Sequence, residues 1–157
     1  MKLEFKKNSD PVWHEIIAPI IHKYNLDFFP NIHTITPDGY EYEYVDGPTL
    51  EEYINEGNEI TQKDIIEIKI QLDHVFKILF EISLKESDKL LNKYMWYHDP
   101  ILANLIWDFK KKKLTLIDID SICFGSRVPI SYINNLFLQP LEYELHKENL
   151  RTFTRTL

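Results

Sequence analysis

The spacing of apolar residues predicts a strand followed by a helix at the start of the chain. Residues 2–7 alternate apolar side chains (Leu3 and Phe5) with charged ones, which is typical of a short edge strand. Ser9-Asp10-Pro11 then combines capping side chains with a proline, a common helix start. The apolar spacing extends this helix to about Tyr24, and we expect Pro19 to kink or locally break it.

Two further alternating runs predict a β-hairpin. Residues 32–36 and 40–45 flank the turn sequence Pro37-Asp38-Gly39. Because side chains alternate along a strand, the tyrosines at 40, 42 and 44 should share one face.

The middle of the chain predicts two helices. Thr49 and Glu52 have the spacing of a capping box for a short helix over residues 50–55. Thr61 opens the longest helix. Its buried stripe should comprise Ile65, Ile68, Leu72, Val75, Phe76, Leu79 and Ile82.

A second hairpin is predicted over residues 105–119. Four lysines at 110–113 separate its two apolar runs and are expected to form a solvated turn. Two more helices are predicted at 130–138 and about 141–150. Since no linker or internal repeat interrupts the pattern, we expect one α+β domain over residues 1–157.

Composition narrows the possible functions. A net charge of −7 argues against nucleic acid or an anionic membrane surface as the main partner. The single cysteine, Cys123, excludes an internal disulfide framework, and we expect a cytoplasmic protein without a membrane span. Four glycines cannot form a G-x-G-x-x-G motif or a P-loop at their spacing.

Three polar residues suggest metal-dependent chemistry. Asp99 and Asn104 lie five positions apart, and Asp118 follows the β-like run that comes next. Mg²⁺ is usually bound by one or two carboxylates together with substrate phosphates. If the chain folds back on itself, Asp99, Asn104 and Asp118 can therefore meet around a metal ion used for phosphoryl transfer. Taken singly, they can equally be ordinary turn and strand-end residues.

The order of motifs resembles the protein-kinase-like superfamily, which includes aminoglycoside and choline kinases. Residues 99–104 match the catalytic loop D-x-x-x-x-N, and Ile117-Asp118-Ile119-Asp120 resembles the I-D-x-D metal segment of the small-molecule kinases. Residues 43–50 resemble the hinge that joins the two kinase lobes. Phe29-Pro30-Asn31-Ile32 resembles the segment that follows the regulatory helix.

The resemblance implies a role for each matching residue. Asp99 would be catalytic, Asn104 and Asp118 would hold Mg²⁺ or Mn²⁺, and the backbone of Glu43 and Val45 would bind adenine of ATP. The remaining implied residues are Tyr42 beside the nucleotide and, in supporting roles, Glu15, His98 and Asp120.

Departures from the kinase pattern set the expected architecture. Residues 1–45 would form a reduced N-lobe of one helix and a β-hairpin, and residues 46–157 a helical C-lobe. No lysine is a clear counterpart of the ATP-binding lysine, so a partner chain could complete the N-lobe. Ile101 replaces the lysine of Ser/Thr protein kinases, which favours a small hydroxyl-bearing acceptor.

Two other functions remain open at this stage. The chain could be a pseudokinase that binds a nucleotide or a protein partner without catalysis, or an α+β interaction domain. His98 could act as a general base near neutral pH or be a loop histidine bonded to backbone.

Overall fold

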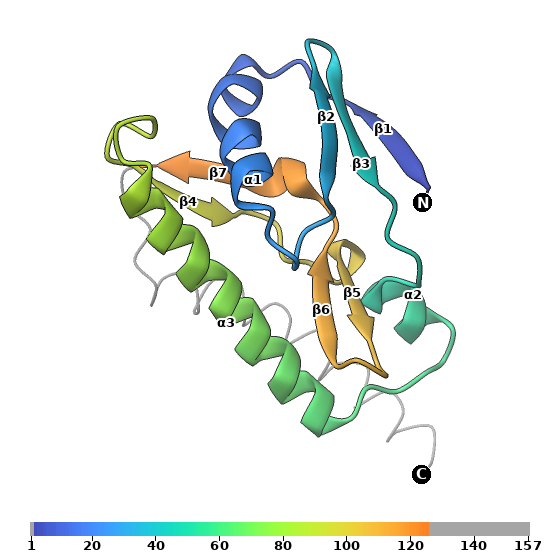
Figure 1. Ribbon diagram of the computed structural model, residues 1–157. Coiled ribbons are helices and arrows are strands. Elements are labelled where there is room, and N and C mark those ends of the chain that lie inside the picture. Colours follow the sequence, from blue (N-terminus) through green and yellow to red (C-terminus); the bar gives the residue numbers. More distant parts are fainter. Residues whose placement is uncertain (1, 126–157) are drawn as a thin grey trace.

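The computed structural model describes residues 2–125, which form strands, helices and turns in the order of Figure 1. Their bounds are β1 Leu3–Lys7, a π-helical turn Trp13–Ile17, α1 Ala18–Tyr24, β2 Ile32–Thr36, β3 Gly39–Glu43, α2 Leu50–Asn55, α3 Gln62–Lys85, β4 Tyr94–Tyr97, β5 Leu105–Asp108, β6 Lys113–Leu116 and β7 Ile122–Gly125. Two 3₁₀ turns, Leu102–Asn104 and Ile119–Ser121, precede β5 and β7. The helices predicted at 130–138 and 141–150 lie outside the described residues.

The first sheet has the strand order β1-β3-β2 and is antiparallel throughout. The predicted edge strand and hairpin are both confirmed. However, β1 joins the hairpin along its whole length, so this part of the molecule is a three-stranded sheet with a helix and not a hairpin alone. Gly39 allows this pairing, because a Cβ there would collide with the backbone carbonyl of Lys6.

The first helix responds to Pro19 as predicted, with a local change of geometry. Pro19 has no N–H to donate to the carbonyl of Glu15, and the turn just before it is π-helical. There the N–H of Ala18 donates to the carbonyl of Trp13. The helix then continues to Tyr24, which keeps Trp13 and Ile17 buried against the sheet.

The helices α2 and α3 begin where their capping residues predict. Thr49 and Glu52 form both hydrogen bonds of the capping box, and the Thr61 hydroxyl accepts from the N–H of Asp64. Every residue of the predicted α3 stripe is buried. Burying this stripe stabilises α3 more than its intrinsic helix propensity can.

The second half of the described chain forms two antiparallel ladders. β5 pairs with β6 as predicted, whereas the pairing of β4 with β7 was not predicted from the sequence. The lysine turn is exposed at residues 110–112 as predicted, and Lys112 in addition extends its ammonium to the buried carboxylate of Asp64 at 2.9 Å.

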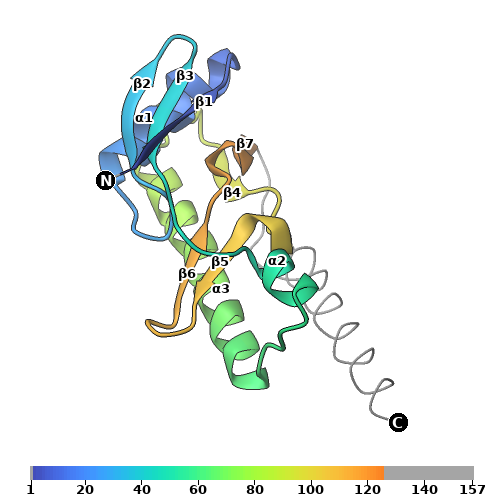
Figure 2. The ribbon, with the colours of Figure 1, turned by 90° about the vertical axis from the view of Figure 1, so that its right-hand side faces the viewer.

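Two views show how these parts stack. The β1-β3-β2 sheet and α1 lie at one end, α2 and the β5-β6 hairpin lie at the other, and the segment after β3 connects them (Figures 1 and 2). β4 and β7 lie between the two ends, alongside α3. Among residues 2–125, no helix is long and apolar enough to cross a membrane.

Candidate active site

The loop after β4 is held against the segment that leads into β7. The N–H of His98 donates to the carbonyl of Ser121 at 2.7 Å, and the side-chain amide of Asn104 donates to the backbone carbonyl of Asp99 at 2.9 Å. The latter bond closes the loop between the acid and the amide. The Asp99 carboxylate is half-buried and makes no hydrogen bond to a described residue.

Asn104 also links this loop to Asp118. Its backbone carbonyl accepts from the N–H of Ile117 at 3.0 Å, which places the next residue, Asp118, beside the loop. The hydroxyl of Ser121 donates to Asp118 Oδ2 at 3.0 Å and orients that carboxylate. The structure therefore brings Asp99, Asn104 and Asp118 into one neighbourhood.

Lys6 of β1, which is 112 residues from Asp118 along the chain, completes this cluster. Its ammonium lies 2.9 Å from Asp118 Oδ1 and 2.8 Å from Asp120 Oδ2. Burial opposes its charge, but the hydrogen bonds and the negative charge of Asp120 and Asp118 raise the pKa of Lys6 above its usual value. Lys6 is therefore a lysine paired with both acids of the I-D-x-D segment.

The sequence provided only a weak signal for Lys6. Strand alternation places Lys6 and Glu4 on the same face of β1, but the pairing spans 112 residues of chain. The sequence shows no clear counterpart of the ATP-binding lysine of kinases, and the fold places Lys6 against Asp118 and Asp120.

Two further residues surround Asp120. The side-chain amide of Asn8 donates to Asp120 Oδ1 at 3.0 Å. Tyr40 is buried beside Trp13, with ring centroids 4.9 Å apart. Burial, followed by the nearby Asp120 carboxylate, raises the pKa of Tyr40 well above its usual range, so its phenol stays protonated. Asp120 is thus held by a cation, an amide and a neutral phenol.

Tyr97 forms the buried floor of the same region. Its ring stacks on Phe29 with centroids 6.0 Å apart, and its buried hydroxyl makes no hydrogen bond to a described residue. Burial raises the pKa of Tyr97 well above its usual range, and the negative charge of Asp118 adds to this effect. The phenol therefore adds no charge of its own to the acidic cluster.

The hinge residues lie where β3 leaves the sheet. The Tyr42 hydroxyl donates to Glu4 Oε2 at 3.0 Å, on the face of the sheet that carries Lys6. The N–H of Glu43 donates to the backbone carbonyl of Asn31 at 2.9 Å. Within the described chain, neither the carbonyl of Glu43 nor the N–H of Val45 makes a backbone hydrogen bond outside the strand ladders.

Two predicted supporting residues lie away from the cluster. Glu15 is exposed on the π-helical turn and forms no ion pair with Lys6 or any other described residue. His98 is exposed, and its only hydrogen bond within residues 2–125 is made by its backbone N–H. This placement favours the loop-histidine interpretation of His98 over the general base.

The predicted metal ligands Asn104 and Asp118 lie among few other acidic side chains. No group of three or more His, Cys, Asp or Glu side chains gathers in the described part of the chain. The oxygen-bearing side chains nearby are Asp118 and Asp120, whose carboxylates contact Lys6, Ser121 and Asn8, and the side-chain amide of Asn104. Mg²⁺ takes few protein ligands and completes its shell with water and phosphate, and its binding here stays a prediction.

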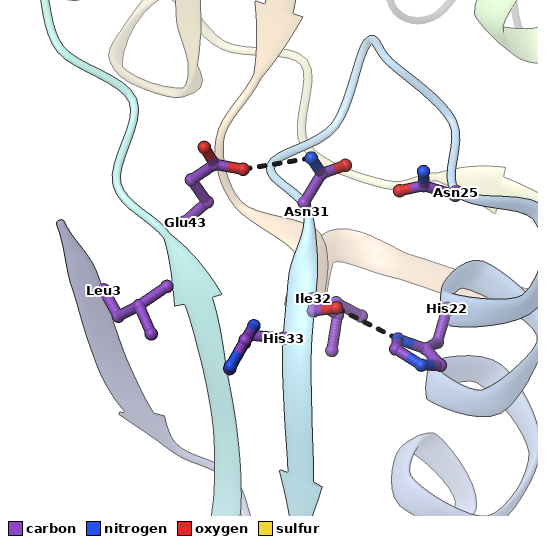
Figure 3. Close-up of a pocket in the computed structure, with 7 residues that line it drawn as sticks. All are labelled: Leu3, His22, Asn25, Asn31, Ile32, His33 and Glu43. Atoms are coloured by element: carbon purple, nitrogen blue, oxygen red, sulfur yellow. Dashed lines mark hydrogen bonds between the residues drawn. The ribbon is translucent and has the colours of Figure 1, made fainter. Parts of the chain in front are cut away.

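A separate polar hollow of about 400 Å³ lies behind the hinge (Figure 3). Asn31 donates to Glu43 across its rim, and His22 contacts the carbonyl of Ile32. Its lining residues are Leu3, His22, Asn25, Asn31, Ile32, His33 and Glu43. None of them belongs to the carboxylate cluster. The Glu43 side chain therefore lies outside the cluster, although its backbone belongs to the segment predicted as the hinge.

Comparison with known proteins supports the fold. No family model and no curated protein sequence matches the chain. Among solved structures, the fold is similar to that of the Cydia pomonella granulovirus kinase PK-1, with a TM-score of 0.51 and 18% sequence identity. The match covers 78% of this chain and 42% of that kinase. The chain thus has a kinase-like fold and spans less than half the length of that relative.

Proposed function

We propose that this kinase-like chain is a phosphotransferase that uses ATP and Mg²⁺ to phosphorylate a small hydroxyl-bearing acceptor. The observation that carries the proposal is the Lys6–Asp118 ion pair beside the Asp99–Asn104 loop. Phosphoryl transfer needs positioned cations and a group that orients the acceptor, and it needs little covalent chemistry from the protein. This cluster supplies both kinds of group.

Each residue has a distinct part in the proposed reaction. The carboxylate of Asp118 and the amide oxygen of Asn104 would hold Mg²⁺, which neutralises phosphate charge when bound. Lys6 would exchange its contacts with the carboxylates for contacts with phosphate oxygens. Asp99 would take the proton of the acceptor hydroxyl while the new O–P bond forms, the bond to the leaving phosphate oxygen breaks, and ADP leaves.

The site also fits a nucleotide at the hinge. The carbonyl of Glu43 and the N–H of Val45 would provide the acceptor and donor that an adenine edge requires. Tyr42, on the Lys6 face of β3, would line the space between the hinge and the carboxylates. Mg²⁺ or Mn²⁺ can serve in this site, because both accept carboxylate and amide oxygens.

Thermal unfolding with ATP and Mg²⁺ tests the proposal directly. At a ligand concentration of about 100 times Kd, binding to the native state adds about 2.7 kcal/mol, which raises Tm by roughly 5–10 °C in a chain of this size. Lys6→Met and Asp118→Asn should reduce this shift. Lys7→Met is the matched control, because Lys7 lies on the same strand with its side chain exposed on the opposite face.

Turnover is then measured on a panel of sugars, choline-like alcohols and aminoglycosides. Asp99→Asn should keep the ATP-dependent shift and lose about 10²–10⁴-fold in ATP consumption, since it removes proton transfer and leaves the metal ligands intact. If wild type shows no shift and Asp118→Asn behaves like it, the proposed site is wrong. A shift without consumption of ATP on any acceptor would refute the transferase and leave only nucleotide binding.

A further inference from the structure

β1 has an open edge in the described structure. β1 is the terminal strand of the β1-β3-β2 sheet, and its single neighbour is β3 (Figure 1). An edge strand exposes backbone N–H and C=O groups that can pair with another strand. Phe5, at the middle of β1, also exposes 55% of its surface. Pairing of this edge with another strand would satisfy these backbone groups and remove the Phe5 ring from water.

The register shows which backbone groups point outward. The N–H of Tyr44 donates to the carbonyl of Lys2, and the N–H of Asn8 donates to the carbonyl of Asp38. In an antiparallel pair, such hydrogen-bonded positions alternate with positions whose groups face away from the partner. The even-numbered residues of β1 therefore bond to β3, and Leu3, Phe5 and Lys7 present their N–H and C=O groups at the open edge.

We propose that this edge pairs with β1 of a second copy of the chain, with Phe5 facing Phe5. A two-fold axis perpendicular to the sheet relates the two strands, so the pairing is antiparallel and closes as a dimer. Phe5 of each copy exchanges both backbone hydrogen bonds with Phe5 of the other. Leu3 and Lys7 do the same with each other across the axis.

The side chains fit this register on both faces. On the Lys6 face, Glu4 of one copy stands directly opposite Lys6 of the other, in the closely spaced type of pair with Cα atoms about 4.5 Å apart. The symmetry produces this contact twice. On the other face, the two exposed Phe5 rings come together and lose their contact with water. Charge and apolar burial therefore select the same register.

The dimer has a consequence for the carboxylate cluster. Because the two-fold axis is perpendicular to the sheet, both Lys6 side chains remain on the same face of the joined sheet. Each then has a carboxylate of the second copy, Glu4, beside the Asp118 and Asp120 of its own chain. The dimer therefore places the Glu4 carboxylate of the second copy next to Lys6. Glu15 of the same chain is exposed and does not occupy this position. The inference stands on strand geometry and does not require the proposed reaction.

Sedimentation velocity of the full chain over a wide concentration range tests the proposal. Wild type should show a reversible monomer–dimer equilibrium that weakens with salt. Phe5→Pro should be monomeric, because it removes an outward N–H that β3 does not use and proline is tolerated at such an edge position. Its circular dichroism should match wild type. Glu4→Lys should raise the dimer Kd about tenfold, since it replaces two attractive pairs by repulsive ones.

Disulfide trapping tests the register. Facing Cα atoms in a hydrogen-bonded pair are about 5.5 Å apart, a spacing a disulfide can bridge, so Phe5→Cys should cross-link to itself on mild oxidation. Glu41→Cys is the matched control, because Glu41 neighbours Phe5 on the same face but one strand further from the axis. Both variants carry Cys123→Ser; burial raises the pKa of Cys123 to about 11, so this thiol is already unreactive at neutral pH.

Three results would overturn the proposal. The first is a wild-type chain that stays monomeric at every concentration. The second is a Phe5→Pro variant that is folded and dimerises as well as wild type. The third is equal cross-linking of Glu41→Cys and Phe5→Cys, which would show random collision in place of a defined strand pair.

Discussion

Replacing Lys6 by methionine should destabilise the fold through the two carboxylates it leaves behind. Lys6 donates to Asp118 and Asp120 at 2.9 and 2.8 Å, and those carboxylates are 29% and 24% exposed. A hydrogen bond to a charged group contributes about 1.5–3 kcal/mol when it is well buried. Lys6 is itself 41% exposed. Solvent therefore screens both contacts, and we expect a total loss of about 1–2 kcal/mol.

The pH dependence follows from the raised pKa of Lys6. A lysine whose pKa is higher in the folded than in the unfolded state stabilises the fold fully below its unfolded value of 10.5. This contribution is lost as the pH rises through the folded pKa. The difference in unfolding free energy between wild type and Lys6→Met should therefore be constant near neutral pH and shrink above pH 10.5.

Urea denaturation at a series of pH values measures this difference. Lys7→Met is the control and should stay within about 0.5 kcal/mol of wild type, because Lys7 is exposed. A double-mutant cycle with Asp120→Asn should give a coupling free energy of about 1 kcal/mol. The reasoning is refuted if Lys6→Met and Lys7→Met are equally stable, or if the difference does not change above pH 10.5.

Three further substitutions test the supports of the site. Lys112→Met should cost about 1 kcal/mol at neutral pH, because it strips the ammonium from the buried Asp64. Burial opposes the charge of Asp64, yet Lys112 and the other donors lower the pKa of Asp64. The stability that the ion pair contributes is therefore present above the unfolded pKa of 3.8 and is lost at lower pH. In urea denaturation, the cost of Lys112→Met should accordingly shrink as the pH falls below 3.8. Ser83→Ala should cost about 1–3 kcal/mol, since the buried N–H of Met95 loses its acceptor at 2.8 Å; hydrogen exchange of that amide should accelerate. Thr49→Ala should cost about 1 kcal/mol in thermal unfolding by removing the α2 cap, and an equal cost for Thr49→Ser, which keeps the capping hydroxyl, would contradict the capping role.

The helices of this chain were predictable because their signals are local. A capping residue and an apolar period of three to four positions lie within one segment, and Thr49, Thr61 and the α3 stripe behave as those signals require. The two hairpins were predictable for the same reason, since each closes over a short turn. The Asp99–Asn104 spacing is local as well, and its hydrogen bond forms inside the loop.

The pairing of β4 with β7 and the role of Lys6 were not predictable in this way. β4 and β7 are joined by the Asp99–Asn104 loop and the β5-β6 hairpin, so no turn signal connects their sequences. Lys6 and Asp118 are separated by almost the whole described chain. The sequence position of Glu15 is compatible with an ion pair or with a solvent-facing acid, and only the structure places it on the exposed face of its helical turn.

The sequence by itself determined the chemistry that is available: an acid, an amide and two aspartates in kinase-like order. These residues could be recognised from their spacing within short stretches of sequence, because local structure depends mainly on residues that are close in the chain. Only the tertiary structure decided which cation meets those acids and which strand edge is left open. Both depend on the packing of the β1-β3-β2 sheet over the β4–β7 region, where contacts between distant segments are set by burial and charge and leave no periodic trace in the sequence.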